Sequence, residues 1–87
     1  MKVSYAPQFK RQFKKLPKAL QEEVFQKIEL FRNIKQHSLL KVHKLKGKLQ
    51  GRLSFSVNYR FRIIFIWETQ DQSAIFLSIG DHSVYDM

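Results

Sequence analysis

The chain has 87 residues, and its 16 Lys and Arg outnumber its 7 Asp and Glu, so the formal net charge is +9. This length predicts one small domain with a modest core, and this charge favours a nucleic acid, a membrane surface or an acidic protein as the partner. The absence of cysteine excludes a disulfide scaffold and a thiolate metal site, and it fits a reducing compartment.

The sequence predicts neither a targeting segment nor a membrane span. Its N-terminal stretch MKVSYAPQFKRQF lacks the apolar core of a signal peptide. The longest apolar run, IIFIW at 63–67, is too short to cross a bilayer. We therefore expect the protein to be in the cytoplasm and to have no membrane partner. Because no Pro/Gly-rich linker or repeat divides the chain, residues 1–87 are expected to form a single domain.

The first 34 residues predict a short strand and then two helices. Residues 2–5 (KVSY) have the β-branched and aromatic content of a strand. Residues 7–16 predict an amphipathic helix, because one face collects apolar side chains at spacings of four and three, namely Phe9, Phe13 and Leu16. Pro17 interrupts this helix, and residues 18–34 predict a second one. Two helices joined this closely form a hairpin.

From residue 53 onward the apolar period changes to two, which is typical of a strand with one buried face. The predicted strands are residues 53–58, then 59–68, which continue the pattern, and 74–79, which follow a polar hairpin turn at 69–73. We expect them to form an antiparallel meander with one face packed on the helices, which gives an α+β fold. The other face carries Ser54, Ser56 and Arg62, so it is expected to be partly polar and open to a ligand.

Residues 41–52 (KVHKLKGKLQGR) form a basic segment with five Lys or Arg and no acid. These five are Lys41, Lys44, Lys46, Lys48 and Arg52. The two glycines of the segment predict a flexible loop. We expect this loop to follow a phosphate backbone, where each neutralised phosphate releases counterions. The alternative is a solvated lysine-rich loop without a ligand.

Arg62 is predicted to lie in the middle of a strand among bulky apolar residues. A charged guanidinium at such a position is expected to have a partner or a function. Its planar fork suits phosphate recognition and the charge that develops on a phosphorane. The alternative is a salt bridge across the sheet to Glu68, Asp71 or Asp81. Arg60 lies closer to the start of the predicted strand and is expected to be exposed.

Three histidines could transfer protons near neutral pH. His37 lies after the second helix and is expected at the surface, whereas His43 lies within the basic segment. His82 follows the last predicted strand, just past Gly80, which permits a turn over the sheet edge. A lone histidine is more often structural or exposed. His43, Asp81 and His82 could in principle bind a metal, but they lack a recognised ligand spacing.

Four stretches together point to a known family. They are FKRQFKKLP (9–17) before a second helix, HKLKGKLQGRLSFSV (43–57) with an H-x-L-x-G pattern, YRFRIIF (59–65) with an aromatic-Arg-aliphatic-aliphatic-aromatic pattern, and SIGDHSVY (78–85) with a Gly-x-His-x-x-Tyr ending. In this order, and at this length and charge, the whole chain resembles the RelE/ParE superfamily of toxins from type II toxin–antitoxin systems.

The resemblance implies a RelE-like fold, in which an N-terminal strand and a helical hairpin pack on a small antiparallel sheet. The RelE-like branch consists of endoribonucleases that use no metal or other cofactor, and most of them cut mRNA in the ribosomal A site. The ribose 2′-OH attacks the adjacent phosphate and leaves a cyclic phosphate and a free 5′-OH. The implied partners are mRNA, the ribosome with its 16S rRNA, and a cognate acidic antitoxin.

The resemblance also implies residue roles. Arg62 is expected to stabilise the phosphorane, His82 to act as general acid or base, and Tyr85 to orient the phosphate or stack on a base. His43 matches a position that some members use as a second proton-transfer group. The RNA backbone is expected to contact Lys41, Lys44, Lys46, Lys48, Arg52 and Arg60.

This sequence departs from the pattern where several relatives carry a catalytic carboxylate. The matching stretches SVNYR (56–60) and HSLLKVH (37–43) contain no acid, and the strand lysines of other members are missing too. The expected acid–base system is then a histidine pair. Two alternatives stay open: a ParE-like poison of DNA gyrase without nuclease activity, and a degenerate member that only binds RNA or its antitoxin.

Overall fold

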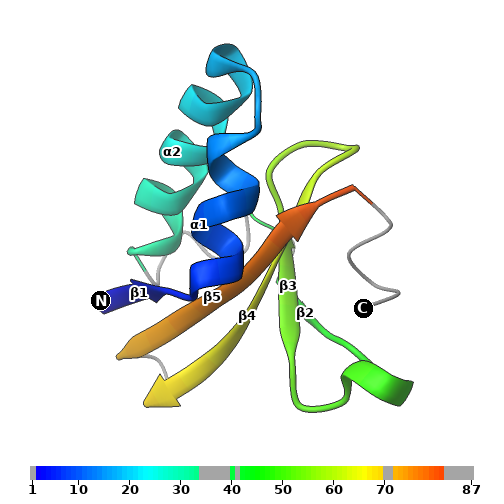
Figure 1. The fold of residues 1–87 in the computed structure, drawn as a ribbon. Helices are drawn as coiled ribbons and strands as arrows, with labels where there is room; N and C mark the ends of the chain where they lie inside the picture. Colours follow the sequence, from blue (N-terminus) through cyan, green and yellow to red (C-terminus); the bar gives the residue numbers. More distant parts are fainter. Residues whose placement is uncertain (1, 34–39, 41, 70–71, 82–87) are drawn as a thin grey trace.

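The structure, a computed structural model, describes residues 2–33, 40, 42–69 and 72–81, and the structural statements below concern these residues. The chain forms a strand, two helices and then four further strands (Figure 1). The elements are β1 (Lys2–Tyr5), α1 (Pro7–Lys14), α2 (Lys18–Phe31), β2 (His43–Lys44), the 3-10 helix η2 (Gly47–Leu49), β3 (Leu53–Ser56), β4 (Arg62–Thr69) and β5 (Ser73–Gly80).

The described strands form one sheet in the order β1-β5-β4-β3-β2. β3, β4 and β5 form the predicted antiparallel meander, and β2 pairs antiparallel with β3 at one edge. β1 pairs in parallel with β5, since the helical hairpin carries the chain over one face of the sheet before it returns. The α+β class is therefore confirmed, and the parallel β1 makes the sheet mixed.

The two helices form the predicted hairpin around Pro17. The side chain of Gln21 holds it closed, because its Nε2 donates to the carbonyl oxygens of Phe13 at 3.0 Å and Leu16 at 3.2 Å. Phe13 lies in the last turn of α1 and Leu16 just beyond it, where backbone carbonyl oxygens lack donor partners within the helix. α1 ends at Lys14, two residues before the predicted end, and α2 ends at Phe31.

The core lies between the helices and one face of the sheet, and Phe31 is at its centre. The ring of this fully buried residue lies 4.8 Å from that of Phe65, 4.9 Å from Phe55 and 5.1 Å from Phe76. Aromatic pairs at such separations stabilise a core beyond the area that they bury. The apolar stripe of α2 thereby attaches the hairpin to the three central strands.

A β-bulge interrupts the alternation of β5. Ile64 pairs with Ser78, but the next residue, Phe65, pairs with Phe76, so Leu77 is an extra residue in β5. A bulge of this kind shifts the pleat by one residue. Ile79 consequently packs in the same core as Phe76, whereas strict alternation predicted opposite faces for these two residues.

The first residues of the predicted strand 59–68 form a hairpin turn instead. β4 begins at Arg62, and the turn closes where the Val57 amide donates to the Phe61 carbonyl oxygen at 3.0 Å. The side chain of Asn58 takes up backbone amides that could otherwise pair with a strand, because its Oδ1 accepts from the amides of Arg60 at 2.9 Å and Phe61 at 2.8 Å. Asn favours such local turns over extended pairing.

The prediction of a flexible loop over 41–52 is wrong for its described part, which contains β2 and η2. Leu49 is buried, and it packs with Leu45 against Ile64 and Leu77 on the sheet face that the helices leave uncovered. The glycines of this segment serve turns, since Gly47 has φ 68° and Gly51 has φ 90°. Apolar burial therefore orders the segment.

Candidate functional site

Arg62 lies at one end of the sheet and not in the middle of a strand, which corrects the sequence prediction. It is the first residue of β4, because the hairpin turn occupies the preceding residues. The register places it between Ser56, the last residue of β3, and Gly80, the last residue of β5. Three strand ends thus meet around the Arg62 backbone.

Two backbone carbonyls orient the half-buried guanidinium of Arg62. Its Nη1 donates to the carbonyl oxygen of Asn58 at 2.6 Å and to that of Phe61 at 3.1 Å. A guanidinium carries five N–H donors, and those on Nε and Nη2 form the planar fork that suits a phosphate. The hairpin turn thus positions a cationic group beside the point where β5 ends.

The predicted alternative of a salt bridge to Glu68 is excluded. Glu68 lies near the other end of β4, about 20 Å from Arg62 along an extended strand. Its carboxylate accepts a hydrogen bond from the Ser73 hydroxyl at 3.4 Å. Asp71 lies outside the described residues, and Asp81 directly follows Gly80, the β5 partner of Arg62.

Asn58 connects this turn to α2, and sequence reasoning missed it. Its Nδ2 donates to Glu23 Oε1 at 2.8 Å, while its Oδ1 accepts the two turn amides and its carbonyl oxygen accepts Arg62. The available signal was an asparagine at the junction of the two predicted strands 53–58 and 59–68, because asparagine favours turns. Asn58 therefore joins the hairpin, the candidate phosphate-binding guanidinium and the helical layer.

The backbone register brings His43 to the same part of the sheet. His43 of β2 pairs with Ser54, and Ser54 pairs with Ile64 of β4. Arg62 lies two residues before Ile64 in β4, so strand spacing places the Cα atoms of His43 and Arg62 about 12 Å apart. Of the other predicted catalytic residues, His82 and Tyr85 lie outside the described residues, as does His37.

Part of the predicted polar face is closed. Ser54 is fully buried and Ser78 is 5% exposed, because the segment with Leu45 and Leu49 covers this side of the sheet. Ser56 and Arg62 are half-buried. Any ligand at this face therefore meets the end of the sheet and not its middle.

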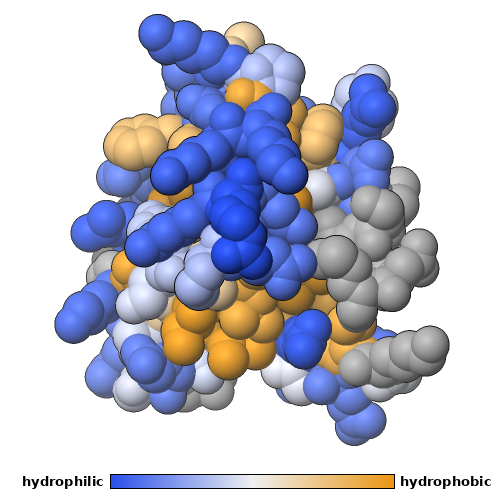
Figure 2. Space-filling model, in the orientation of Figure 1, coloured by the Kyte–Doolittle hydropathy of each residue, from blue (hydrophilic) through white to orange (hydrophobic). Residues whose placement is uncertain are grey.

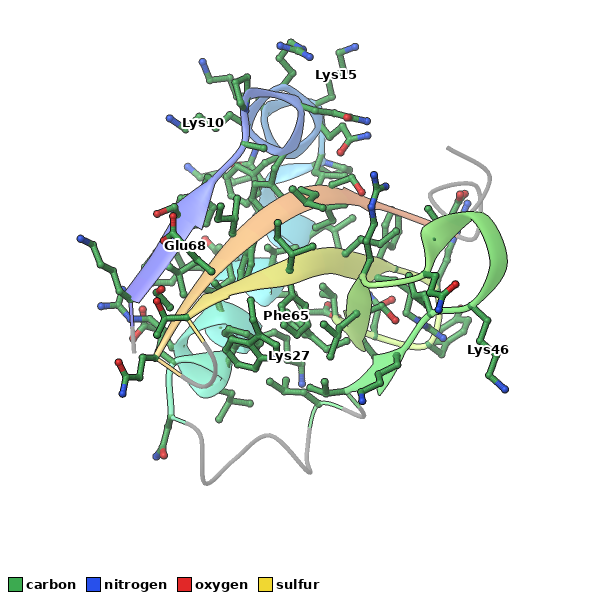
Figure 3. All side chains as sticks on the ribbon, turned by 90° about the horizontal axis from the view of Figure 1, so that it is seen from below. Lys10, Lys15, Lys27, Lys46, Phe65 and Glu68 are labelled. Carbon is green, nitrogen blue, oxygen red and sulfur yellow. The ribbon has the colours of Figure 1, made fainter. Side chains whose placement is uncertain are left out.

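The basic segment surrounds a hollow at the start of β3, at the opposite end of this strand from Ser56, the β3 partner of Arg62. Lys44, Lys46 and Arg52 are exposed and line it, together with Gly47, Gln50, Gly51, Leu45 and Leu53. Lys46 points away from the sheet (Figure 3). Arg60 is exposed as predicted, with its guanidinium carbon 5.6 Å from the centre of the Phe61 ring. Lys48 belongs to η2, and Lys41 lies outside the described residues.

A second basic surface lies on α1. Figure 2 shows hydrophilic side chains gathered over this helix, whose exposed basic residues together with the C-cap residue are Lys10, Arg11, Lys14 and Lys15. Beside it, an apolar groove lies between the helices, lined by Tyr5, Phe9, Phe13, Phe25 and Ile28 and flanked by Lys10 and Lys14. Burial raises the pKa of Tyr5 above its ordinary value.

The described residues lack two features that would indicate other classes of function. Within the part of the chain that the structure describes, no three His, Asp or Glu residues come together as a metal site would require. Among the same residues, neither helix has the length and apolar character needed to cross a bilayer.

Comparisons with known proteins identify the fold. No protein-family model and no curated protein matches the chain. YafQ from E. coli strain BL21(DE3) is 18% identical with a TM-score of 0.75, covering 95% of this chain and 94% of that one. In the RelB–RelE antitoxin–toxin complex from Methanococcus jannaschii, the matched chain is 22% identical with a TM-score of 0.72, covering 97% and 96%.

A third similar structure is the YoeB–YefM complex from Staphylococcus aureus, in which the matched chain is 20% identical. Its TM-score is 0.70, and the match covers 94% of this chain and 97% of that one. All three matches span nearly the whole of both chains. The expected RelE-like fold is therefore confirmed, and the chain shares it with structures of RelE-, YafQ- and YoeB-type proteins.

Proposed function

We propose that this protein is the toxin of a type II toxin–antitoxin module and a metal-independent endoribonuclease that cuts mRNA in the ribosomal A site. One observation carries the proposal: on a RelE-like fold, the register pairs Arg62 with Gly80, directly before the sequence DHSVY at 81–85. This pairing brings the start of the candidate catalytic ending to an oriented guanidinium.

The proposed reaction is an in-line transfer within the RNA. One imidazole, of His43 or His82, removes the proton of the 2′-OH as the O2′–P bond forms. The other protonates the 5′-oxygen as the P–O5′ bond breaks, which leaves a 2′,3′-cyclic phosphate and a 5′-OH. Arg62 stabilises the charge of the phosphorane, and Tyr85 orients the scissile phosphate.

The basic residues of the segment after β2, together with Arg60, are proposed to hold the RNA backbone. The exposed Lys44, Lys46, Arg52 and Arg60 support this assignment, and Lys41 and Lys48 belong to the same proposal from the sequence. Their contribution is electrostatic, so RNA affinity should fall steeply as salt rises.

A cognate antitoxin is the proposed protein partner. The RelE and YoeB structures are described as complexes with RelB and YefM, and the net charge of +9 favours an acidic partner. Expression together with the product of a neighbouring gene should yield a complex that survives purification. The proposed location is the cytoplasm, where mRNA and ribosomes are.

Primer extension on a translated mRNA, with and without ribosomes, tests the proposal. His82→Ala should slow cleavage about 100-fold or more. Arg62→Lys keeps the charge but loses the planar fork, and it should slow cleavage about 100-fold. The control is Arg11→Ala on α1, which should cut like the wild type. A message that stays intact while growth still stops would contradict the proposal and favour the gyrase poison, whose mark is double-strand DNA breaks.

A further inference from the structure

The tip of the β3–β4 hairpin exposes an aromatic side chain. Tyr59 is 89% exposed, whereas Phe31, Phe55, Phe65 and Phe76 are fully buried. Burial therefore does not account for the aromatic ring at position 59. An aromatic ring in water beside cations is the arrangement on which an unpaired nucleobase stacks.

Hydrogen bonds of the Asn58 side chain fix the turn that carries Tyr59. Asn58 accepts hydrogen bonds from the amides of Arg60 and Phe61, and it donates to Glu23 on α2. A turn anchored to a helix presents its side chain at a defined place, and binding then costs less conformational entropy. The hairpin turn therefore fixes the backbone position from which the Tyr59 ring extends.

The same turn contacts the candidate phosphate-binding residue. Arg62 Nη1 lies 2.6 Å from the carbonyl oxygen of Asn58, which belongs to the peptide that joins Asn58 to Tyr59. A phosphate on the remaining donors of Arg62 is thus next to the turn, and the neighbouring nucleotide can reach its tip. Arg60, the next residue after Tyr59 in the chain, is exposed and adds positive charge to the hairpin tip.

We infer that Tyr59 is a stacking platform for an unpaired RNA base adjacent to the phosphate that Arg62 binds. The inference rests on the proposed function, because it takes single-stranded RNA as the ligand. Stacking tolerates every base, since each has a π-face. Tyr59 therefore adds affinity and sets which nucleotide lies over Arg62, without reading base identity.

The test is fluorescence anisotropy of a labelled single-stranded RNA whose 2′-OH groups are methylated, so that it binds but is not cut. Tyr59→Ala should weaken binding about 5- to 150-fold, which is the loss of one base–aromatic stack. Tyr59→Phe and Tyr59→Trp should bind like the wild type. The matched control is Phe25→Ala, which removes a second large aromatic side chain that is exposed among the described residues, 62% exposed on α2.

The salt dependence separates a stack from a charge effect. A stack releases no counterions, so Tyr59→Ala should leave the slope of log affinity against log salt unchanged, while Arg60→Ala should reduce it by about one. Wild-type affinity in Tyr59→Ala, an equal loss in Phe25→Ala, or a wild type without RNA affinity would each overturn the inference.

The test of the nuclease can be distinguished from the test of the stacking role of Tyr59. A wild type that binds the methylated RNA through Tyr59 but leaves the unmethylated message intact on ribosomes contradicts the nuclease and supports the stack. A wild type that cuts the message, while Tyr59→Ala binds RNA equally well, supports the nuclease and overturns the stack.

Discussion

Asn58 is the residue on which the geometry of the candidate site depends most. Its side chain makes three hydrogen bonds of 2.8 to 2.9 Å, and its carbonyl oxygen accepts a fourth from Arg62. A charged donor such as a guanidinium forms stronger hydrogen bonds than a neutral one. Any rearrangement of this turn therefore changes where the charge of Arg62 lies.

The bond between Asn58 and Glu23 can be measured with a double-mutant cycle. Glu23→Ala leaves the Asn58 amide without its acceptor and should lower the free energy of unfolding by about 1 kcal/mol. In an Asn58→Ala background the same change should cost almost nothing, because the partner is already gone. Urea unfolding of the four proteins measures the coupling.

The control for this cycle is Glu22→Ala, which removes an exposed acid one residue away. Its effect should be close to zero in both backgrounds. Equal losses for Glu22→Ala and Glu23→Ala would mean that the hairpin is not attached to α2 through Asn58.

At the scale of elements, α1 completes the edge of β5. β1 pairs with β5 only as far as Phe76, so the remaining residues of β5 lack a neighbouring strand on that side. Gln12 of α1 supplies an acceptor there, since its Oε1 lies 2.8 Å from the Ile79 amide nitrogen. A side chain thus replaces a strand just before the chain leaves the sheet at Gly80.

Removing this acceptor should loosen the end of β5. Gln12→Ala should lower the free energy of unfolding by about 1 kcal/mol and speed hydrogen exchange at the Ile79 amide, while exchange at the Phe76 amide should speed up only as far as global stability falls. Gln12→Glu keeps an oxygen acceptor and should restore slow exchange. Uniform acceleration across β5 in Gln12→Ala would contradict a local role.

At the scale of the whole molecule, the positive charge is divided between two surfaces. The basic segment after β2 covers the sheet face that the helices leave uncovered, and the α1 cations lie on the helical layer (Figure 3). Only the first surface lies on the sheet face that carries Ile64, two residues from Arg62. The second flanks the apolar groove between the helices, so net charge by itself does not locate an RNA site.

The two surfaces should differ in the salt dependence of RNA binding. Lys46→Gln should reduce the slope of log affinity against log salt by about one, because one phosphate contact is lost. Lys15→Gln, an equally exposed position on the helical layer, should leave the slope unchanged. The measurement is RNA binding at several salt concentrations. Equal slopes for the two variants would show that the basic segment does not contact RNA phosphates.

The sequence alone was sufficient to predict the helical hairpin, the meander and the α+β class. Helical spacing of Phe9 and Phe13 and alternation from residue 53 onward report local periodicity, which a chain shows without tertiary information. The resemblance also anticipated the RelE-like fold. The ordering of residues 42–52 was missed, because it depends on contacts of Leu45 and Leu49 with distant strands.

The composition, the order of elements and the chemistry available to this protein are therefore properties of its sequence. Tertiary structure alone decided that Arg62 lies at a strand end, that Asn58 joins the hairpin to α2, and that a bulge turns Ile79 into the core. The physical reason is that these features depend on hydrogen bonds and packing between residues far apart in the chain. Such contacts leave no periodic signal in a single sequence, and they determine where the charge and the exposed ring of the candidate site lie.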